Sequence, residues 1–160
     1  MAVYAFTRAI LDGTPIHVAN SGRIWRDFTY IDDIIEGVFR VMEKPPGAQA
    51  ASDVRIPSPA DSSAPYRVYN IGNGKPEELN RLIRLIEIAL GREARRIDAP
   101  MPPGDIVRSH ADTTALSREI DYVPSTPLDV GVRRFVDWYL DYHAQSKQRD
   151  RKRMELVGHC

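Results

Sequence analysis

The chain has 160 residues, of which 42% are hydrophobic and 28% are charged, and its formal net charge is zero. This length and composition predict one globular domain with its own hydrophobic core. The balanced charge gives no global field that would attract nucleic acid or an anionic membrane. The single cysteine, Cys160, excludes an internal disulfide framework and a cysteine-based metal site, which is typical of a reducing cytoplasm. Because the sequence shows no export signal and no apolar run of about 18 residues, we expect a soluble, cytoplasmic protein.

The first elements in chain order are a helix, two short strands and a second helix. Residues 2–11 place apolar side chains on one helical face and are followed by Gly13, which is typical of a helix end. Residues 16–18 and 23–28 are rich in strand formers and are separated by Ala-Asn-Ser-Gly, so they predict a small hairpin. Residues 31–42 repeat apolar side chains at steps of three and four, and the acidic pair near their start predicts a helix cap rather than a catalytic site.

A proline-rich stretch separates these elements from the next strand and helix. Residues 44–65 hold five prolines among small and polar residues, which predicts a mobile loop within one domain. Residues 66–71 predict a strand that ends at Gly-Asn-Gly, and Pro76 predicts the start of a helix that runs to Leu90.

The last third of the chain predicts two more helices and a charged tail. The first covers residues 112–120, and the second starts in a capping-box-like Thr-Pro-Leu-Asp and runs from Leu128 to His143. Beyond His143 the apolar pattern ends, so we expect a domain over residues 1–143 and a disordered tail over residues 144–160. The basic residues of this tail are also compatible with a nucleic-acid patch, but a solvated terminus is the simpler interpretation.

Arg26 is the candidate functional residue that local sequence suggests most directly. It lies where an extended, aromatic-rich run gives way to a helix, so packed neighbours would hold its guanidinium in place. A guanidinium is a planar fork of donors that stays charged, which suits capture of a diphosphate. On local sequence alone, a structural pairing of Arg26 with a carboxylate is the stronger interpretation.

Several sequence blocks, taken in order, resemble one enzyme family. The blocks are the run from Arg26 to Ile34, the run from Ser62 to Asn73, the tripeptide Pro103-Gly104-Asp105, and the run from Phe135 to Tyr139. In this order and spacing they resemble the extended short-chain dehydrogenases of the NAD-dependent epimerase/dehydratase family, and within it the UDP-glucuronate 4-epimerase branch. The resemblance runs from Met1 to about His143 and covers the C-terminal half of the family's pattern. It implies an α/β fold, mostly helices with a few short strands, in which the N-terminal dinucleotide-binding part is absent.

The resemblance also implies roles for individual residues in holding a UDP-sugar. Arg26 matches the family position that contacts the diphosphate, and Asp105 matches a carboxylate that accepts from ribose hydroxyls. Val18 matches a position that lines the uracil pocket. A plain turn aspartate explains Asp105 almost as well, and a buried valine needs no ligand to explain it.

Two further positions depart from the family pattern. Galactose-type epimerases have an arginine three places before the aspartate, where this chain has Pro102, so Arg108 is our hypothesis for a replacement phosphate contact. His110 stands where relatives often have tyrosine, and it would either donate to a phosphate or pack under the following helix.

The residues that carry the family's redox chemistry are not found in this sequence. The family's cofactor loop needs three glycines after a first strand, whereas Gly72-x-Gly74 has two and follows a different strand. None of the seven tyrosines is followed by a lysine four places later, which the family's proton transfer requires. No histidine spacing typical of a metal site is present. We therefore expect no catalytic residue, no metal and no NAD on this chain alone, although the complete enzyme would use NAD.

The function that we expect is the nucleotide-sugar-binding portion of a UDP-glucuronate 4-epimerase. Its partners would be the UDP-sugar and the missing N-terminal half, and the complete enzyme could form a homodimer. Without that half, an apolar helix face and a strand edge would be exposed, so we expect the chain to fold poorly by itself. Two alternatives stay open: a UDP-sugar decarboxylase or dehydratase of the same family, and a non-catalytic interaction module.

Overall fold

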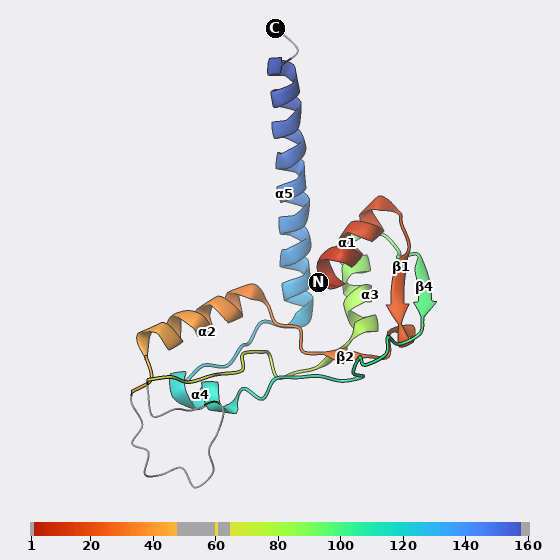
Figure 1. Ribbon diagram of the computed structural model, residues 1–160. Coiled ribbons are helices and arrows are strands. Elements are labelled where there is room, and N and C mark those ends of the chain that lie inside the picture. The colour runs from red at the N-terminus through yellow and green to blue at the C-terminus, as the bar shows by residue number, and fades with distance from the viewer. Residues whose placement is uncertain (1, 48–59, 61–64, 158–160) are drawn as a thin grey trace. The chain divides into compact units, whose positions relative to one another are not determined.

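The computed structural model describes residues 2–47, 60 and 65–157, with side chains described as far as Gln145 (Figure 1). Most of the predicted mobile loop, residues 48–59 and 61–64, lies outside the described residues. The chain divides into two compact units. The domain expected over residues 1–143 stays a prediction. Unit 1 is Met1–Gly22, Leu79–Pro102 and Asp129–Cys160, and unit 2 is Arg23–Glu78 and Pro103–Leu128. No described helix combines the length and the apolar character that crossing a membrane requires.

Unit 1 contains three helices and a parallel pair of strands among its described residues. They are α1 (Ala2–Asp12), β1 (Ile16–Ala19), α3 (Leu79–Leu90), β4 (Arg96–Ala99) and α5 (Leu128–Val157), of which only Leu128 falls in unit 2. β1 pairs in parallel with β4, in a register that sets Ile16 opposite Arg96 and Val18 opposite Asp98. The predicted helix over residues 2–11 is confirmed, because its apolar period of three and four is encoded locally. The helix predicted to run from Pro76 to Leu90 is confirmed in its end, but α3 begins at Leu79, because Glu77–Glu78 form a short strand.

The hydrophobic core of unit 1 is assembled from all of these elements except β4. α3 buries one full face, and its Leu82, Ile83 and Ile86 have no exposed surface. The other buried apolar side chains of the unit are Ile10, Ile16, Val18, Leu79, Val132, Val136 and Tyr139. Each large side chain buried in this way stabilises the fold by about 1.5–3 kcal/mol relative to exposure. α1 also meets α5 through an edge-on contact of Tyr4 with Tyr139, whose ring centroids are 5.3 Å apart.

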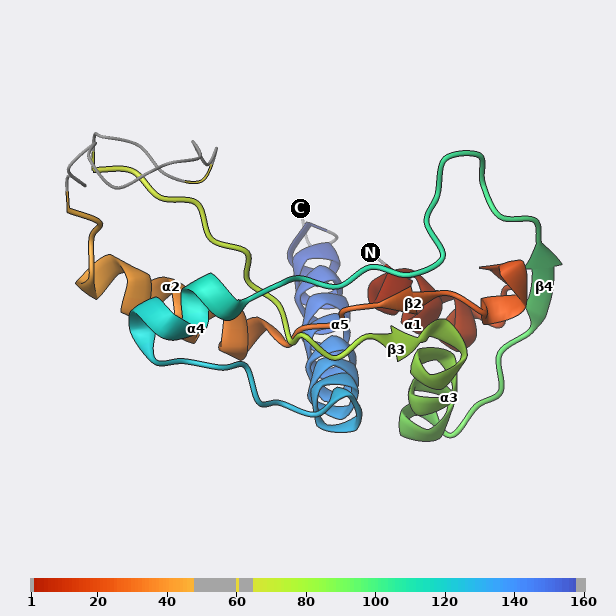
Figure 2. The same cartoon turned by 90° about the horizontal axis from the view of Figure 1, so that it is seen from below.

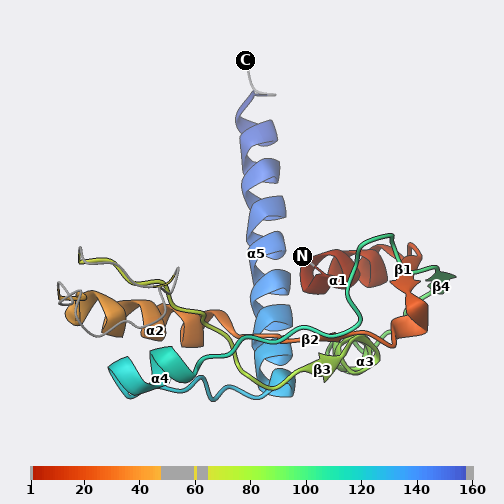
Figure 3. The ribbon, with the colours of Figure 1, turned by 60° about the horizontal axis from the view of Figure 1, so that its bottom comes forward.

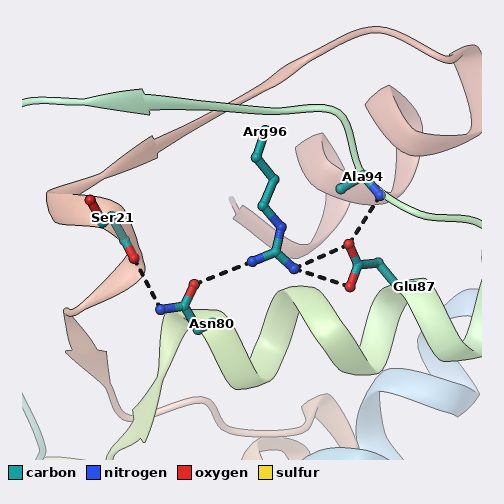
Figure 4. A network of polar contacts seen from close by, with 5 residues as sticks. All are labelled: Ser21, Asn80, Glu87, Ala94 and Arg96. Atoms are coloured by element: carbon teal, nitrogen blue, oxygen red, sulfur yellow. Dashed lines mark hydrogen bonds and ion pairs between the residues drawn. The ribbon is translucent and has the colours of Figure 1, made fainter.

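A polar network attaches β4 to α3 (Figure 4). Arg96 Nη2 donates to both carboxylate oxygens of Glu87 at 3.1 and 3.0 Å, and Arg96 Nη1 reaches Asn80 at 3.5 Å. Asn80 in turn donates to the Ser21 carbonyl at 3.0 Å, and the Ala94 N–H donates to Glu87 at 3.0 Å. This charge-assisted contact of one guanidinium nitrogen with both carboxylate oxygens holds β4 to α3, although the side chains of β4 are mostly exposed. The sequence pattern did not predict this strand.

The predicted hairpin of residues 16–28 is wrong. β1 pairs with β4, and the two lie side by side in Figure 1. In contrast, β2 (Trp25–Arg26) pairs antiparallel with β3 (Glu77–Glu78), and Figure 2 shows where these two strands lie. Between the strands, three successive residues have positive φ: Asn20 at 50°, Ser21 at 51° and Gly22 at 77°. This left-handed run is longer than a two-residue hairpin turn, and it leads the chain away from β1. A Cβ at Gly22 would also collide with the Asn80 side chain, so the tight approach requires glycine here.

Unit 2 contains β2, β3, α2 (Ile31–Glu43) and α4 (Thr114–Ile120). The main chain of Trp25 is paired on both sides, with β3 on one side and with residues 107–109 on the other. On the second side the Trp25 N–H donates to the Val107 carbonyl at 2.8 Å, and the Ser109 N–H donates to the Trp25 carbonyl at 3.2 Å. The short β2 strand is therefore the centre of a small three-segment arrangement.

α2 is fixed by a buried carboxylate near its start. Asp33, which is 8% exposed, accepts from the Thr126 N–H at 3.0 Å, and the Tyr122 hydroxyl donates to the Asp33 carbonyl at 2.9 Å. The predicted capping role of the acidic pair is not what Asp33 does, since it holds the segment after α4 instead. Figure 3 shows α4 beside α2, where the Arg40 guanidinium donates to the Asp121 carbonyl at 3.2 Å.

Two other elements differ from the expectations. Within the described residues, 66–71 form no strand, although their side chains alternate between exposed and half-buried as in one. A strand needs a hydrogen-bonded neighbour, and the described residues offer this segment only an isolated bridge at Arg67. The last helix does not end at His143, because α5 continues to Val157. Residues 144–157 lack glycine and proline and are rich in helix formers, so intrinsic propensity extends the helix without an apolar face.

Candidate functional site

Arg26 and Asp105 form the centre of the candidate site in unit 2. Although 79 positions separate them in sequence, Arg26 Nη2 donates to Asp105 Oδ1 at 2.8 Å. Their side chains are 26% and 37% exposed, respectively, so the pair lies at the surface. Arg26 Nη1 also donates to the Trp25 carbonyl at 2.9 Å, which orients the guanidinium against its own strand. The structure thus brings together the two residues for which the family resemblance predicts contacts to the phosphate and the ribose.

A tight turn presents Asp105 to Arg26. Gly104 has a φ of 83°, a conformation that glycine adopts without strain, and Asp105 follows it directly. Asp105 Oδ1 also accepts from the N–H of Ile106 at 2.8 Å. The Asp105 carboxylate is therefore held by the main chain at Ile106 as well as by Arg26. Its remaining lone pairs can accept further hydrogen bonds at the surface.

Arg108 and His110 lie on the same segment as Asp105. The main chain of Arg108 forms an isolated parallel bridge with Trp25, so Arg108 is beside the strand that carries Arg26. Both side chains are exposed. This places Arg108 and His110 on the segment that forms the site, while their phosphate contacts stay predictions.

Val18 lies in unit 1, whereas Arg26 and Asp105 lie in unit 2. The Val18 side chain is 1% exposed and forms part of the core between β1 and the helices. A uracil-lining role for Val18 stays a prediction, and the enclosed side chain means that such a contact would use its main chain.

Sequence reasoning missed the residue that follows Arg26. The carboxylate oxygen Oδ2 of Asp27 accepts from the N–H groups of Gly74 and Ala111 at 3.0 and 3.2 Å. Thr29 Oγ1 accepts from the Asn73 N–H at 3.0 Å. Two features of the sequence could have pointed to Asp27. One is the short polar pattern Arg-Asp-Phe-Thr at the end of a strand, and the other is the distant Gly-Asn-Gly. Nothing in that pattern states which main-chain groups the aspartate will meet.

Ionisable groups elsewhere in unit 2 respond to their surroundings. Burial raises the pKa of the Tyr122 phenol, and the negative charge and hydrogen bond of Asp33 add to the rise. The side-chain and main-chain hydrogen bonds from Thr114 lower the pKa of Asp112, which lies just before α4. Both groups act in the structural support of α2 and α4 rather than at Arg26.

The residues present do not form a dinucleotide loop at Gly72-x-Gly74. A Cβ at Gly72 would lie 2.7 Å from Asp27 Oδ2 and 2.9 Å from the Ala111 Cβ, so the space beside this glycine is filled by protein. The next helix, α3, begins only at Leu79 after the β3 strand. A pyrophosphate needs open backbone N–H groups at the start of a helix, and this turn does not offer them.

Comparison with known proteins relates the chain to one family. The model of the NAD dependent epimerase/dehydratase family matches residues 1–72. The chain is 43% identical over 143 residues to Protein CapI of Staphylococcus aureus, covering 89% of this chain and 43% of that protein. It is 38% identical over 140 residues to a probable UDP-glucuronate 4-epimerase of Rhizobium meliloti, covering 87% of this chain and 41% of that protein.

Solved structures show the same fold. The chain matches the crystal structure of UDP-glucuronic acid 4-epimerase from Bacillus cereus in complex with UDP-glucuronic acid and NAD, with a TM-score of 0.70 and 23% identity. The match covers 89% of this chain and 40% of that one. The chain thus spans less than half the length of the relatives that it matches. Sequence and fold together relate this chain to the NAD dependent epimerase/dehydratase family, and it corresponds to the C-terminal portion, about 40%, of those relatives.

Proposed function

We propose that this chain is the nucleotide-sugar-binding portion of a UDP-glucuronate 4-epimerase, in which Arg26 contacts the diphosphate and Asp105 the ribose. The observation that carries the proposal is the direct contact of these two residues at the surface of unit 2. By resemblance, Val18, Arg108 and His110 would complete the contacts to the nucleotide. The relative from Rhizobium meliloti, a probable UDP-glucuronate 4-epimerase, supports the choice of substrate class.

The energetics of the pair favour a binding role over a structural one. An ion pair with this exposure adds only about 0–1 kcal/mol to folding. A charge-assisted hydrogen bond to a ligand phosphate is worth about 1.5–3 kcal/mol. Arg26 would therefore contribute more to ligand binding than to the fold. Asp105 holds the guanidinium in place until the diphosphate binds, and Arg26 can then use its fork of donors for the ligand oxygens.

In the complete enzyme, NAD would take and return the sugar hydride. The filled space beside Gly72 leaves no room for the cofactor at the Gly72-x-Gly74 turn, and we assign NAD to the N-terminal portion of the complete protein. The residues of this chain would anchor the nucleotide while the sugar turns. We accordingly propose that the chain by itself does not catalyse epimerisation.

The surface of α2 supports a role for the N-terminal portion as a partner. One apolar stripe of this helix is 45–69% exposed, and it consists of Ile31, Ile35, Val38, Phe39 and Met42. Tyr66 and Val68 are also about half exposed, at 51% and 49%. Such a surface needs a protein to cover it, and the N-terminal portion present in relatives is the partner that we propose. The same surface would also suit a non-catalytic interaction module, so ligand binding has to decide between the two functions.

The deciding experiment is calorimetry with UDP-glucuronate, UDP and uridine. We would use the chain alone and the complemented protein, in which the N-terminal portion of the Rhizobium meliloti relative is supplied as a second chain. We expect Arg26→Ala to weaken binding of UDP and UDP-glucuronate by about 10–100-fold, the equivalent of 1.5–3 kcal/mol. Binding of uridine and of NAD should be unchanged, because neither would use this guanidinium.

Two controls sharpen this test. Arg26→Lys keeps the charge without the fork and should recover only part of the loss. Arg40→Ala removes another surface arginine of unit 2, which pairs with Glu36, and should leave UDP affinity unchanged. Equal affinity of the Arg26→Ala variant for UDP, or an equal loss for uridine, contradicts the proposed function. Absence of nucleotide binding together with tight capture of the N-terminal portion would favour the interaction module.

A further inference from the structure

The side chain of Asp27 joins three segments of unit 2 that are distant in sequence. Its Oδ2 accepts from the Gly74 N–H, 47 positions away, and from the Ala111 N–H, 84 positions away. A carboxylate that accepts from two main-chain N–H groups fixes both segments more firmly than neutral hydrogen bonds would. Asp27 therefore connects the strand of Arg26 with the turn at Gly74 and with the end of the segment that carries Asp105.

Neighbouring contacts reinforce this junction. Thr29 Oγ1 accepts from the Asn73 N–H at 3.0 Å and donates to the Asp27 carbonyl at 3.4 Å. Gly72 allows the close approach, because a Cβ there would lie 2.7 Å from Asp27 Oδ2 and 2.9 Å from the Ala111 Cβ. The packing leaves little room for the segments to slide past one another.

Asp27 is enclosed and does not itself face a ligand. Its other oxygen, Oδ1, is buried and has no hydrogen-bond partner among the described residues. A buried acceptor cannot touch a nucleotide at the surface, where Arg26 and Asp105 lie. Any influence of Asp27 on binding must therefore pass through the residues that it positions.

The segment from Asp105 to Ala111 is pinned at two places. Near its middle it pairs with Trp25, through the Val107 carbonyl and the Ser109 N–H. At its end it is held by Asp27. Because Trp25 and Asp27 flank Arg26 in sequence, these two anchors determine where Asp105 stands relative to the guanidinium.

We propose that Asp27 is a positioning residue, which sets the Arg26–Asp105 geometry by clamping the Asp105–Ala111 segment and the Gly74 turn to the Arg26 strand. This inference rests on the proposed function, since it assigns to Asp27 an effect on diphosphate binding. Asparagine can replace the carboxylate in part, because its amide oxygen can still accept from both N–H groups. Alanine removes both hydrogen bonds and frees the segment.

The test compares variants of the complemented protein by calorimetry with UDP and with uridine, alongside thermal unfolding. We expect Asp27→Ala to weaken UDP binding about tenfold, a loss of 1.4 kcal/mol, and Asp27→Asn to restore most of it. Uridine, which would use Asp105 but not Arg26, should lose less affinity than UDP does. The matched control is Asp33→Ala, which removes another carboxylate of unit 2 that accepts from a main-chain N–H and is itself buried, whereas Asp27 is half-buried. It should lower Tm as much as Asp27→Ala does and leave UDP affinity within twofold.

A double variant separates positioning from general destabilisation. In an Arg26→Ala background, Asp27→Ala should cost less UDP affinity than it does when Arg26 is present, because one of the two residues that it positions is gone. If Asp27→Ala does not fold, Gly72→Ala tests the same junction by pushing Asp27 and Ala111 apart without removing a polar group. It should weaken UDP binding as well.

The outcomes distinguish this inference from the proposed function. If Arg26→Ala leaves UDP affinity intact, the proposed function fails. If Arg26→Ala weakens UDP binding and Asp27→Ala does not, the proposed function stands and the positioning role is wrong. Equal losses of UDP affinity for Asp27→Ala and Asp33→Ala, or additive losses in the double variant, would also overturn the positioning role.

Discussion

The two units differ in how they are held together. Unit 1 has a continuous apolar core built from α1, α3, α5 and β1, whereas the buried apolar residues of unit 2 include only Ile24, Leu116 and Ile120 among the large ones described. Unit 2 depends instead on carboxylates that bind main-chain N–H groups, and it exposes the apolar stripe of α2. The unit with the weaker core is the one that carries Arg26 and Asp105. Under the proposed function, this difference is what we expect if another protein surface completes the unit that binds the nucleotide.

The largest expected effect tests the core of unit 1. Leu82 has no exposed surface. Leu82→Ala should lower the free energy of unfolding by about 2–5 kcal/mol, because the substitution leaves a cavity in the core. Phe39 of α2 is 59% exposed, so Phe39→Ala should change the stability of the isolated chain by less than about 0.5 kcal/mol. Urea unfolding of both variants measures the contrast. Similar losses of unfolding free energy in Leu82→Ala and Phe39→Ala would contradict this prediction. They would mean that unit 2 already forms a core around Phe39 in the isolated chain.

The second prediction reverses that contrast by adding the N-terminal portion. If the α2 stripe is covered in the complemented protein, Phe39→Ala should weaken association of the two chains by about tenfold or more, because an aromatic contact is lost. Ile88 of α3 is comparably exposed at 60% and lies in unit 1, so Ile88→Ala serves as the matched control and should have no effect. Titration of labelled N-terminal portion against each variant gives the affinities. Equal affinities of Phe39→Ala and Ile88→Ala for the N-terminal portion would argue against α2 as the surface that binds it.

A smaller effect is expected at high pH in both units. Burial raises the pKa of Tyr122 in unit 2 and of Tyr139 in unit 1. Since the folded phenol binds its proton more tightly than the unfolded one, its stabilising contribution is complete below about pH 10 and is lost as the pH rises through the folded pKa. Tyr122→Phe and Tyr139→Phe should each flatten the loss of stability above about pH 10. Urea unfolding across that pH range checks this, and an unchanged profile in both variants contradicts it.

The smallest effect concerns the start of α4. Hydrogen bonds from Thr114 hold the pKa of Asp112 below its ordinary value, so the stabilising contribution of this carboxylate is present above the unfolded pKa and fades as the pH falls through the folded pKa. Thr114→Ala removes the side-chain hydrogen bond and should return the Asp112 pKa toward its ordinary value. NMR titration of the carboxyl group follows this directly. A pKa that stays low in the variant would assign the shift to the main-chain hydrogen bond alone.

The sequence determined the elements that depend on local order. Apolar spacing in α1 and α3 predicts which face is buried, and in α2 it predicts the helix but not the burial of its apolar face. The blocks around Arg26 and Asp105 pointed to the family and to these two residues as candidates. Each of these signals lies within a window of about a dozen residues. The helix content and the α/β class were predictable for that reason.

The tertiary structure alone decided which segments meet. The pairing of β1 with β4, the contact of Arg26 with Asp105 and the junction at Asp27 all join residues far apart in sequence. A carboxylate that will accept from distant main-chain N–H groups looks the same in sequence as one that faces solvent. Long-range partners are selected by the packing of the whole chain, and a short window of sequence does not contain that information.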